Sequence, residues 1–160
     1  MTKGTIIYPP HINEVSLYVG GMRETTNLYL METNPKYARG NMKVDILGVK
    51  CELILQYSLW EKGVQYKANP LLVNRPVGDW DIQVLNMNID VKGMWSYLTE
   101  FRINKEAHHK EKNITHYTFV QPHSEALDNT TATYWGFSHD EITKWETKQL
   151  KFTEAYIKLI

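Results

Sequence analysis

The stretch Gly78–Gly93 reads GDWDIQVLNMNIDVKG, and it alternates polar and apolar residues in two runs separated by Asn86. A period of two over 80–85 and again over 87–92 is typical of half-buried strands, and so short a break predicts a tight antiparallel hairpin. Successive side chains of a strand point to opposite faces. The second strand is therefore expected to place Met87, Ile89 and Val91 on one face and Asn88, Asp90 and Lys92 on the other.

Upstream of this hairpin, the sequence predicts a helix from Asp45 to Lys62. Its apolar residues recur at intervals of three and four and make one stripe, formed by Ile46, Val49, Leu53, Tyr57 and Trp60. Asp45 suits the N-terminal cap, and Gly63 stands where a helix C-terminus favours glycine. Glu52 lies about 100° from the centre of the stripe, so we expect it on the flank of the buried face.

The remaining segments predict a mixed fold. Period-two runs indicate strands at 64–68, 115–121 and 131–137, and 94–98 is expected to begin a helix. Ser138 and Glu141 have the spacing of a capping box, which predicts a helix through Trp145. Residues 104–113 read as a loop or a frayed helix end, and Gly20-Gly21 interrupts a helical spacing near the N-terminus. We expect one α/β or α+β domain with a mixed sheet, an N-terminal extension over 1–40 and a core over about 41–145.

Composition restricts the function classes. The chain has 160 residues, 42% hydrophobic, which is enough for a real core, and its 18 basic and 18 acidic residues give zero net charge. A highly basic nucleic-acid-binding arm is thereby excluded, so that such binding would need a local patch. The single cysteine, Cys51, excludes an internal disulfide and a Cys-rich zinc site. With neither a signal-peptide core nor a membrane-spanning run, we expect a cytoplasmic protein that does not enter the membrane.

The chemistry is concentrated on the hairpin. It brings Asp81 on one strand near Asp90 on the next, with Lys92 two residues further on the same face. Two converging carboxylates suit Mg²⁺ or Mn²⁺, which prefer oxygen ligands. A neighbouring lysine can hold a nucleophilic water or stabilise charge on a phosphate oxygen.

These residues resemble the motif of the PD-(D/E)xK nuclease superfamily, which includes restriction endonucleases and junction resolvases. The match consists of Glu52 on the preceding helix, Asp81 on one strand, and Asp90 and Lys92 on the next; Trp80 stands where the motif has proline. The resemblance implies a restriction-endonuclease-like core, made of a helix, a three-strand meander, a helix and further strands. It also implies that Asp81, Asp90 and the Val91 carbonyl bind Mg²⁺, with Glu52 holding a second metal ion or a water.

Three alternatives stay open. Lys92 can pair with Asp90 on a solvated face without any metal, as cross-strand ion pairs often do. Asp79 shares the face of Asp81 by period two and is its rival as metal ligand. The polar segment after the hairpin either contacts phosphates or is a solvated loop, and its basic residues are Arg102, Lys105, Lys110 and Lys112.

The sequence therefore predicts a metal-dependent nuclease, most plausibly a DNA endonuclease that hydrolyses phosphodiester bonds, and leaves a homodimer open. The alternative is a non-catalytic nucleic-acid-binding or interaction protein that retains the nuclease fold. No phosphate-binding glycine loop and no nucleophile elbow occurs in the chain. A zinc site at His108 and His109 is disfavoured because no cysteine pair supports it.

Overall fold

The computed structural model describes residues 1–33, 42–71, 79–110 and 113–160, without the side chains of residues 24 and 26–33. Its helices are α1 (His11–Thr33), α2 (Met42–Glu61), α3 (Lys105–Lys110) and α4 (His139–Thr143). Its strands are β1 (Thr2–Ile7), β2 (Lys67–Ala68), β3 (Ile82–Val84), β4 (Met87–Gly93), β5 (Glu100–Asn104), β6 (His116–Pro122), β7 (Thr131–Ser138), β8 (Glu146–Gln149) and β9 (Glu154–Leu159). The mixed α/β class predicted from the sequence is confirmed.

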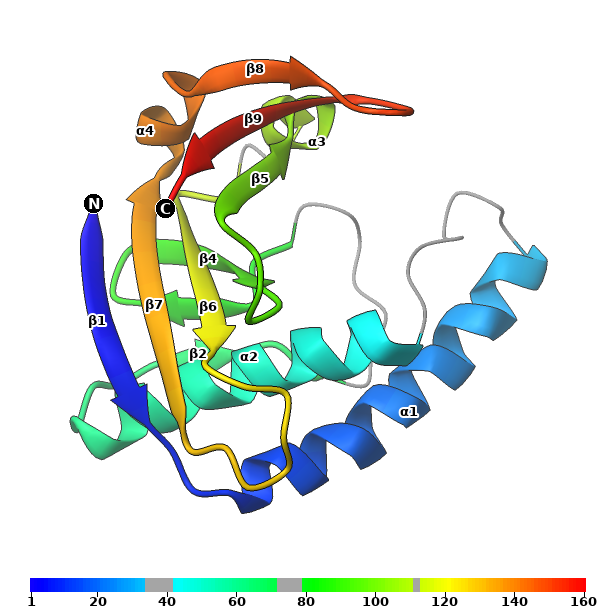
Figure 1. Ribbon diagram of the computed structural model, residues 1–160, viewed down its shortest axis with the longest axis vertical. Coiled ribbons are helices and arrows are strands. Elements are labelled where there is room, and N and C mark those ends of the chain that lie inside the picture. Colours follow the sequence, from blue (N-terminus) through cyan, green and yellow to red (C-terminus); the bar gives the residue numbers. More distant parts are fainter. Residues whose placement is uncertain (34–41, 72–78, 111–112) are drawn as a thin grey trace.

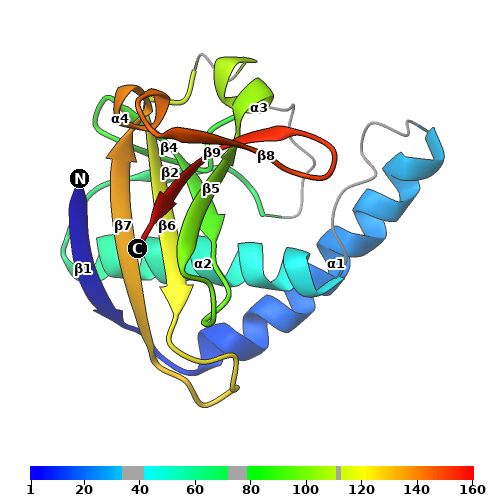
Figure 2. The same ribbon diagram turned by 45° about the horizontal axis from the view of Figure 1, so that its top comes forward.

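The elements form three layers around a six-stranded sheet of order β1-β7-β6-β4-β3-β2. Only the β4–β6 pair is parallel among the neighbours in this sheet; the other pairs are antiparallel. Helices α1 and α2 lie on one side, and a three-stranded antiparallel sheet of order β5-β9-β8 lies on the other with α3 (Figures 1 and 2). No helix in the described ranges has the length and apolar character needed to cross a membrane.

Two apolar clusters separate the layers. Between α2 and the large sheet, Leu47, Cys51 and Ile54 pack against inward residues of β3 and β4 such as Ile82 and Ile89. Between the two sheets, an aromatic cluster forms around Phe101, whose ring contacts Phe119, Trp135, Phe137 and Trp145. The large sheet is thus covered on both faces at β6, where Val120 faces α2 and Phe119 faces β5.

The helix predicted from Asp45 to Lys62 corresponds to α2, which ends one residue before Lys62. Because α2 begins at Met42, three residues before Asp45, this aspartate lies in the first turn of the helix and is not its cap. Gly63 ends it with φ +69°, a conformation that glycine adopts without strain. The predicted apolar stripe is not the whole buried face. Leu47, Cys51 and Leu55 also face the sheet, because α2 is covered by the sheet on one side and by α1 on another. Trp60, at the end of the predicted stripe, is 68% exposed.

The interruption predicted at Gly20-Gly21 does not occur, since α1 continues to Thr33. A Cβ at Gly20 would lie 2.6 Å from Ile46 Cα, so the glycine allows α1 to approach α2 closely. The first 33 residues are integrated into the fold, because β1 pairs with β7 and α1 packs on α2.

The helix predicted at 94–98 is wrong, since the chain makes turns there and continues into β5. Tertiary hydrogen bonds satisfy the backbone groups that a helix would have paired. Gln121 Nε2 donates to the carbonyl oxygens of Trp95 and Leu98, and Ser96 N–H donates to Glu125. Strands β6 and β7 and the capping box at Ser138 are confirmed, although α4 ends at Thr143 rather than at Trp145. Strands β1, β5, β8 and β9 lacked a sequence prediction.

Candidate functional site

The predicted hairpin is formed by β3 and β4, with Val84 opposite Met87. Ile82, Val84, Ile89 and Val91 are buried in the cluster against α2. A Cβ at Gly93 would lie 3.1 Å from Leu47 and 3.2 Å from Cys51, which places this set of β4 positions against α2. The alternate residues Asp90 and Lys92 consequently project from the opposite face, the one that carries the small sheet.

Asp81 lies immediately before β3 and continues its pairing with β4, since its N–H donates to the Ile89 carbonyl at 2.8 Å. Its Oδ2 accepts a hydrogen bond of 2.7 Å from the Val91 N–H, so its carboxylate reaches the residue that follows Asp90. Asp81 and Asp90 are both buried, with 7% and 9% of their surface exposed. The structure therefore brings Asp81, Asp90 and Lys92 together on one face, as the alternation predicts.

Lys92 is the close ionic partner of Asp90. The Lys92 side chain is partly exposed, and its Nζ lies 2.6 Å from the buried Asp90 Oδ2, an ion pair that lacks regular hydrogen-bond geometry. Removing either partner of a buried ion pair leaves an uncompensated charge or an unsatisfied polar group, which is destabilising. The pair thus holds both side chains over the hairpin.

Glu52 lies elsewhere. It is 4% exposed on α2, the helix on the opposite face of the sheet, and its Oε1 lies 3.4 Å from Arg23 of α1. Within the described ranges no group of three or more His, Cys, Asp or Glu side chains is arranged to hold a metal ion. The structure therefore does not bring Glu52 into one cluster with Asp81 and Asp90.

The two carboxylates on the hairpin are oxygen ligands of the kind that Mg²⁺ prefers. Mg²⁺ is commonly bound by one or two carboxylates and completes its shell with waters and substrate phosphate. Asp81 and Asp90 supply two carboxylates that share a face, and the buried Asp90 Oδ2 has Lys92 as its close partner rather than a regular hydrogen bond. The rival Asp79 is exposed and lies outside β3.

The predicted basic segment is divided between β5 and α3, and each of its described cations has an acidic neighbour. Arg102 pairs with Glu100, Lys105 with Glu154 at 3.0 Å, and Lys110 with Glu106. Lys112 lies outside the described residues. Exposed ion pairs of this kind are weak, so they leave a phosphate role open without creating a bare basic patch.

A histidine cluster lies on the same side of the large sheet as Asp90, since Tyr117, the cross-strand partner of Asp90 on β6, contacts His108 of α3. His108 is fully buried on α3, with Nδ1 3.1 Å from the Tyr117 hydroxyl and Nε2 2.9 Å from Thr143 Oγ1. Its ring stacks on His139 with centroids 3.6 Å apart. Burial, together with the smaller effects of the neighbouring His139 and His109, lowers the pKa of His108 to about 4. The sequence analysis missed the burial of His108 because it interpreted the segment around this residue as polar and solvated.

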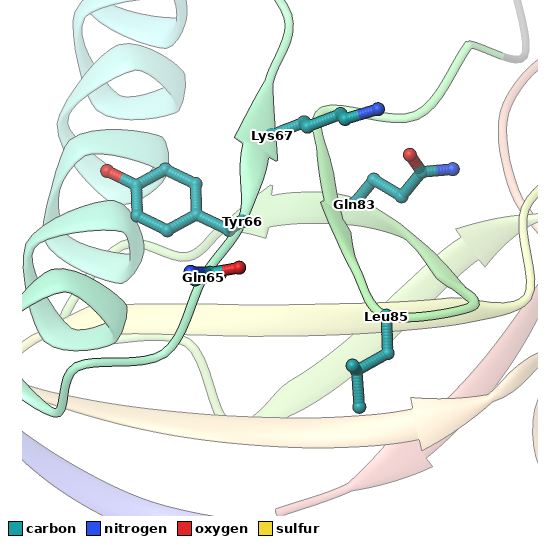
Figure 3. Close-up of a pocket in the computed structure, with 5 residues that line it drawn as sticks. All are labelled: Gln65, Tyr66, Lys67, Gln83 and Leu85. Atoms are coloured by element: carbon teal, nitrogen blue, oxygen red, sulfur yellow. The ribbon is translucent and has the colours of Figure 1, made fainter.

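A groove opens at the edge of the same sheet, between the chain entering β2 and the end of β3 (Figure 3). It has a volume of about 310 Å³ and is lined by Gln65, Tyr66, Lys67, Gln83 and Leu85. Lys67 is the cross-strand partner of Gln83, so both share the face of Asp81. The sequence analysis placed these residues in predicted strands but assigned no function to them.

Comparisons of the chain with protein-family models, with curated proteins and with solved structures each found no match.

Proposed function

We propose that the chain is a metal-dependent nuclease that acts on DNA as an endonuclease and whose reactive groups are Asp81, Asp90 and Lys92. The observation that carries the proposal is their placement on one face of the β3–β4 hairpin, with Asp81 bonded to the Val91 N–H. The order of elements adds support. Helix α2 and the antiparallel strands β2, β3 and β4 follow the first part of the layout that the superfamily resemblance implies, whereas turns and β5 stand where that layout has its second helix.

Each residue has a defined task in this proposal. Asp81, Asp90 and the Val91 carbonyl would hold Mg²⁺ or Mn²⁺, which when bound lowers the pKa of a coordinated water and offsets charge on a phosphate. Lys92 would orient the attacking water and stabilise the charge that develops on the phosphate oxygens. Glu52 is not part of this set in the proposal, because it pairs with Arg23 on the α2 side of the sheet. A cytoplasmic location and a homodimer remain proposals of the same kind.

One observation favours a second candidate, a nucleic-acid-binding or interaction protein without catalysis. The 2.6 Å contact between Lys92 and Asp90 neutralises the carboxylate internally. In that case the polar face would serve only structure or binding, and Mg²⁺ would have no affinity for the hairpin.

A cleavage panel separates the two. Plasmid, linear duplex, single-stranded DNA, a four-way junction and RNA are each incubated with Mg²⁺, Mn²⁺ or chelator. We expect metal-dependent cleavage of at least one substrate, reduced about 100-fold or more in Asp90→Asn and in Lys92→Met. Asp79→Asn is the matched control, since this exposed acid lies just outside the hairpin, and it should retain activity. Cleavage that survives in both hairpin variants, with folding verified by circular dichroism, would refute the assignment.

A further inference from the structure

One cation, Lys67, lines the groove between β2 and β3. Lys67 is exposed, and among the described residues it has no acidic partner. Arg102, Lys105 and Lys110 each have one. An exposed cation without a partner can bind a phosphate and does not have to give up an existing ion pair.

The groove also lies at the correct distance from the candidate metal site. Gln83 stands two residues from Asp81, about 6.6 Å along the strand at the usual rise of a β-strand. Lys67 is directly across from Gln83, and Figure 3 shows both side chains extending to the same side. The spacing between neighbouring strands, about 4.8 Å, puts Lys67 about 8 Å from Asp81. Since a nucleic-acid strand advances about 3.4 Å per nucleotide, this is a distance of about two to three nucleotides.

Aromatic surface continues the groove. A neighbouring hollow of about 510 Å³ is lined by Trp60, Gly63, Val64, Gln65 and Tyr66, and it shares Gln65 and Tyr66 with the first. Trp60 lies in the last turn of α2 with 68% of its surface exposed, which is unusual for so large an apolar side chain. The two hollows meet at Gln65 and Tyr66 on the sheet edge, with Trp60 on the α2 side of this edge and Lys67 on the side of Asp81. A single strand that crosses this edge would place its backbone on the cation and stack a base on the ring.

We infer that this groove binds the unpaired strand of a nucleic-acid substrate next to the cleavage site, with Lys67 on a phosphate and Trp60 stacked on a base. The inference rests on the proposed function for its position in the reaction. Gln83 Nε2 donates to Asn88, so its carbonyl oxygen remains to accept a hydrogen bond from a base or sugar. Base faces are inaccessible within a continuous duplex, so the groove selects substrates that contain a single-stranded segment, such as a flap, fork or overhang.

The test measures binding of a fluorescein-labelled oligo-dT and of a matched duplex by anisotropy, in chelator so that no cleavage occurs. Trp60→Ala should weaken oligo-dT binding by about 5- to 150-fold, whereas Trp60→Phe should retain most of it. Lys67→Gln should weaken binding and reduce the slope of log affinity against log salt by about 0.7. Lys43→Gln is the matched control, because it lies at the far end of α2, about 25 Å from Trp60 at 1.5 Å per residue.

Each outcome has a defined meaning. Unchanged oligo-dT binding in Trp60→Ala and Lys67→Gln, or equal losses on the duplex, would overturn the groove assignment even if cleavage is confirmed. Loss of these contacts together with absence of metal-dependent cleavage would overturn the nuclease but retain the groove as a single-strand-binding site. The inference would also be overturned if the protein bound no nucleic acid, or if it bound anionic lipid vesicles instead and Trp60→Ala abolished that binding.

Discussion

Acidification should destabilise this protein through His108, because the side chain is fully buried and neutral in the fold. Burial lowers its pKa to about 4, and the adjacent Asp140 opposes this shift only partly. His139 stacks on its ring, His109 lies at its edge, and its two nitrogens face Tyr117 and Thr143. Charging the imidazole would turn both of its nitrogens into donors, so the hydroxyl that donates to the neutral ring would have to reorient and accept instead. The charge itself would also be buried, which is unfavourable.

The pH dependence of the free energy of unfolding follows from the difference in proton affinity of His108 between the folded and the unfolded state. In the unfolded chain His108 has a pKa near 6.5, so between pH 6.5 and 4 the unfolded state binds more protons. The free energy of unfolding therefore falls as the pH falls through this range. Each factor of ten in proton affinity is worth about 1.4 kcal/mol, which gives a loss of about 2 to 3 kcal/mol between pH 7.5 and pH 4.5.

Urea unfolding at pH 7.5, 6.5, 5.5 and 4.5 measures this loss for the wild type and for His108→Gln, which cannot titrate. The difference between the two proteins should shrink by about 2 to 3 kcal/mol across the series. His123→Gln, at an exposed histidine, is the control and should keep the wild-type profile. The pKa of Glu141 is lowered to about 2 in the folded protein, so the stability that this carboxylate contributes is lost only below the pH range of the experiment. Parallel pH profiles for wild type and His108→Gln would refute the reasoning.

Three further predictions concern the faces of the large sheet. Asp81→Ala should abolish cleavage and lower the free energy of unfolding by about 1 to 3 kcal/mol, because the buried Val91 N–H loses its acceptor, whereas Asp79→Ala should stay within about 0.5 kcal/mol in urea unfolding. Glu52→Gln should lower stability by about 1 to 3 kcal/mol but leave Mg²⁺ affinity unchanged in calorimetry; a loss of affinity would make Glu52 a metal ligand. Replacing Arg102 and Lys105 together by glutamine should reduce the salt slope of duplex binding by about 1.8 if both contact phosphates, and an unchanged slope would mean that they remain with their glutamates.

The hairpin was predictable because its signals are local. The alternation around Ile89 and Asp90 sets the faces of β4, and the break at Asn86 sets the turn, where Leu85 takes φ +53°. The end of α2 at Gly63 and the capping box at Ser138 are local in the same sense, since each needs only a few neighbouring residues. These features needed no knowledge of the tertiary structure.

Elements whose partners are distant in sequence were missed or misread. Residues 94–98 have helical character, but Gln121 and Glu125 bind their backbone groups from more than 20 residues away. Strand β1 is defined by its pairing with β7, about 130 residues later. Strand β8 is exposed along its length, so it lacks the alternation that reveals a strand.

The position of Glu52 shows why helical periodicity alone cannot assemble a metal site. The connection between the parallel strands β4 and β6 crosses the face that bears Asp90, since Phe101 of β5 packs there on Phe119. Helix α2 packs on the opposite face of the sheet, and Glu52 of this helix lies next to Arg23. A metal ion held by Asp81 and Asp90 would therefore complete its shell from the exposed side, with the Val91 carbonyl, waters and the phosphate of the substrate. This is the ligand set that Mg²⁺ favours over an all-protein cage, so metal affinity should rise when a nucleic-acid strand is bound.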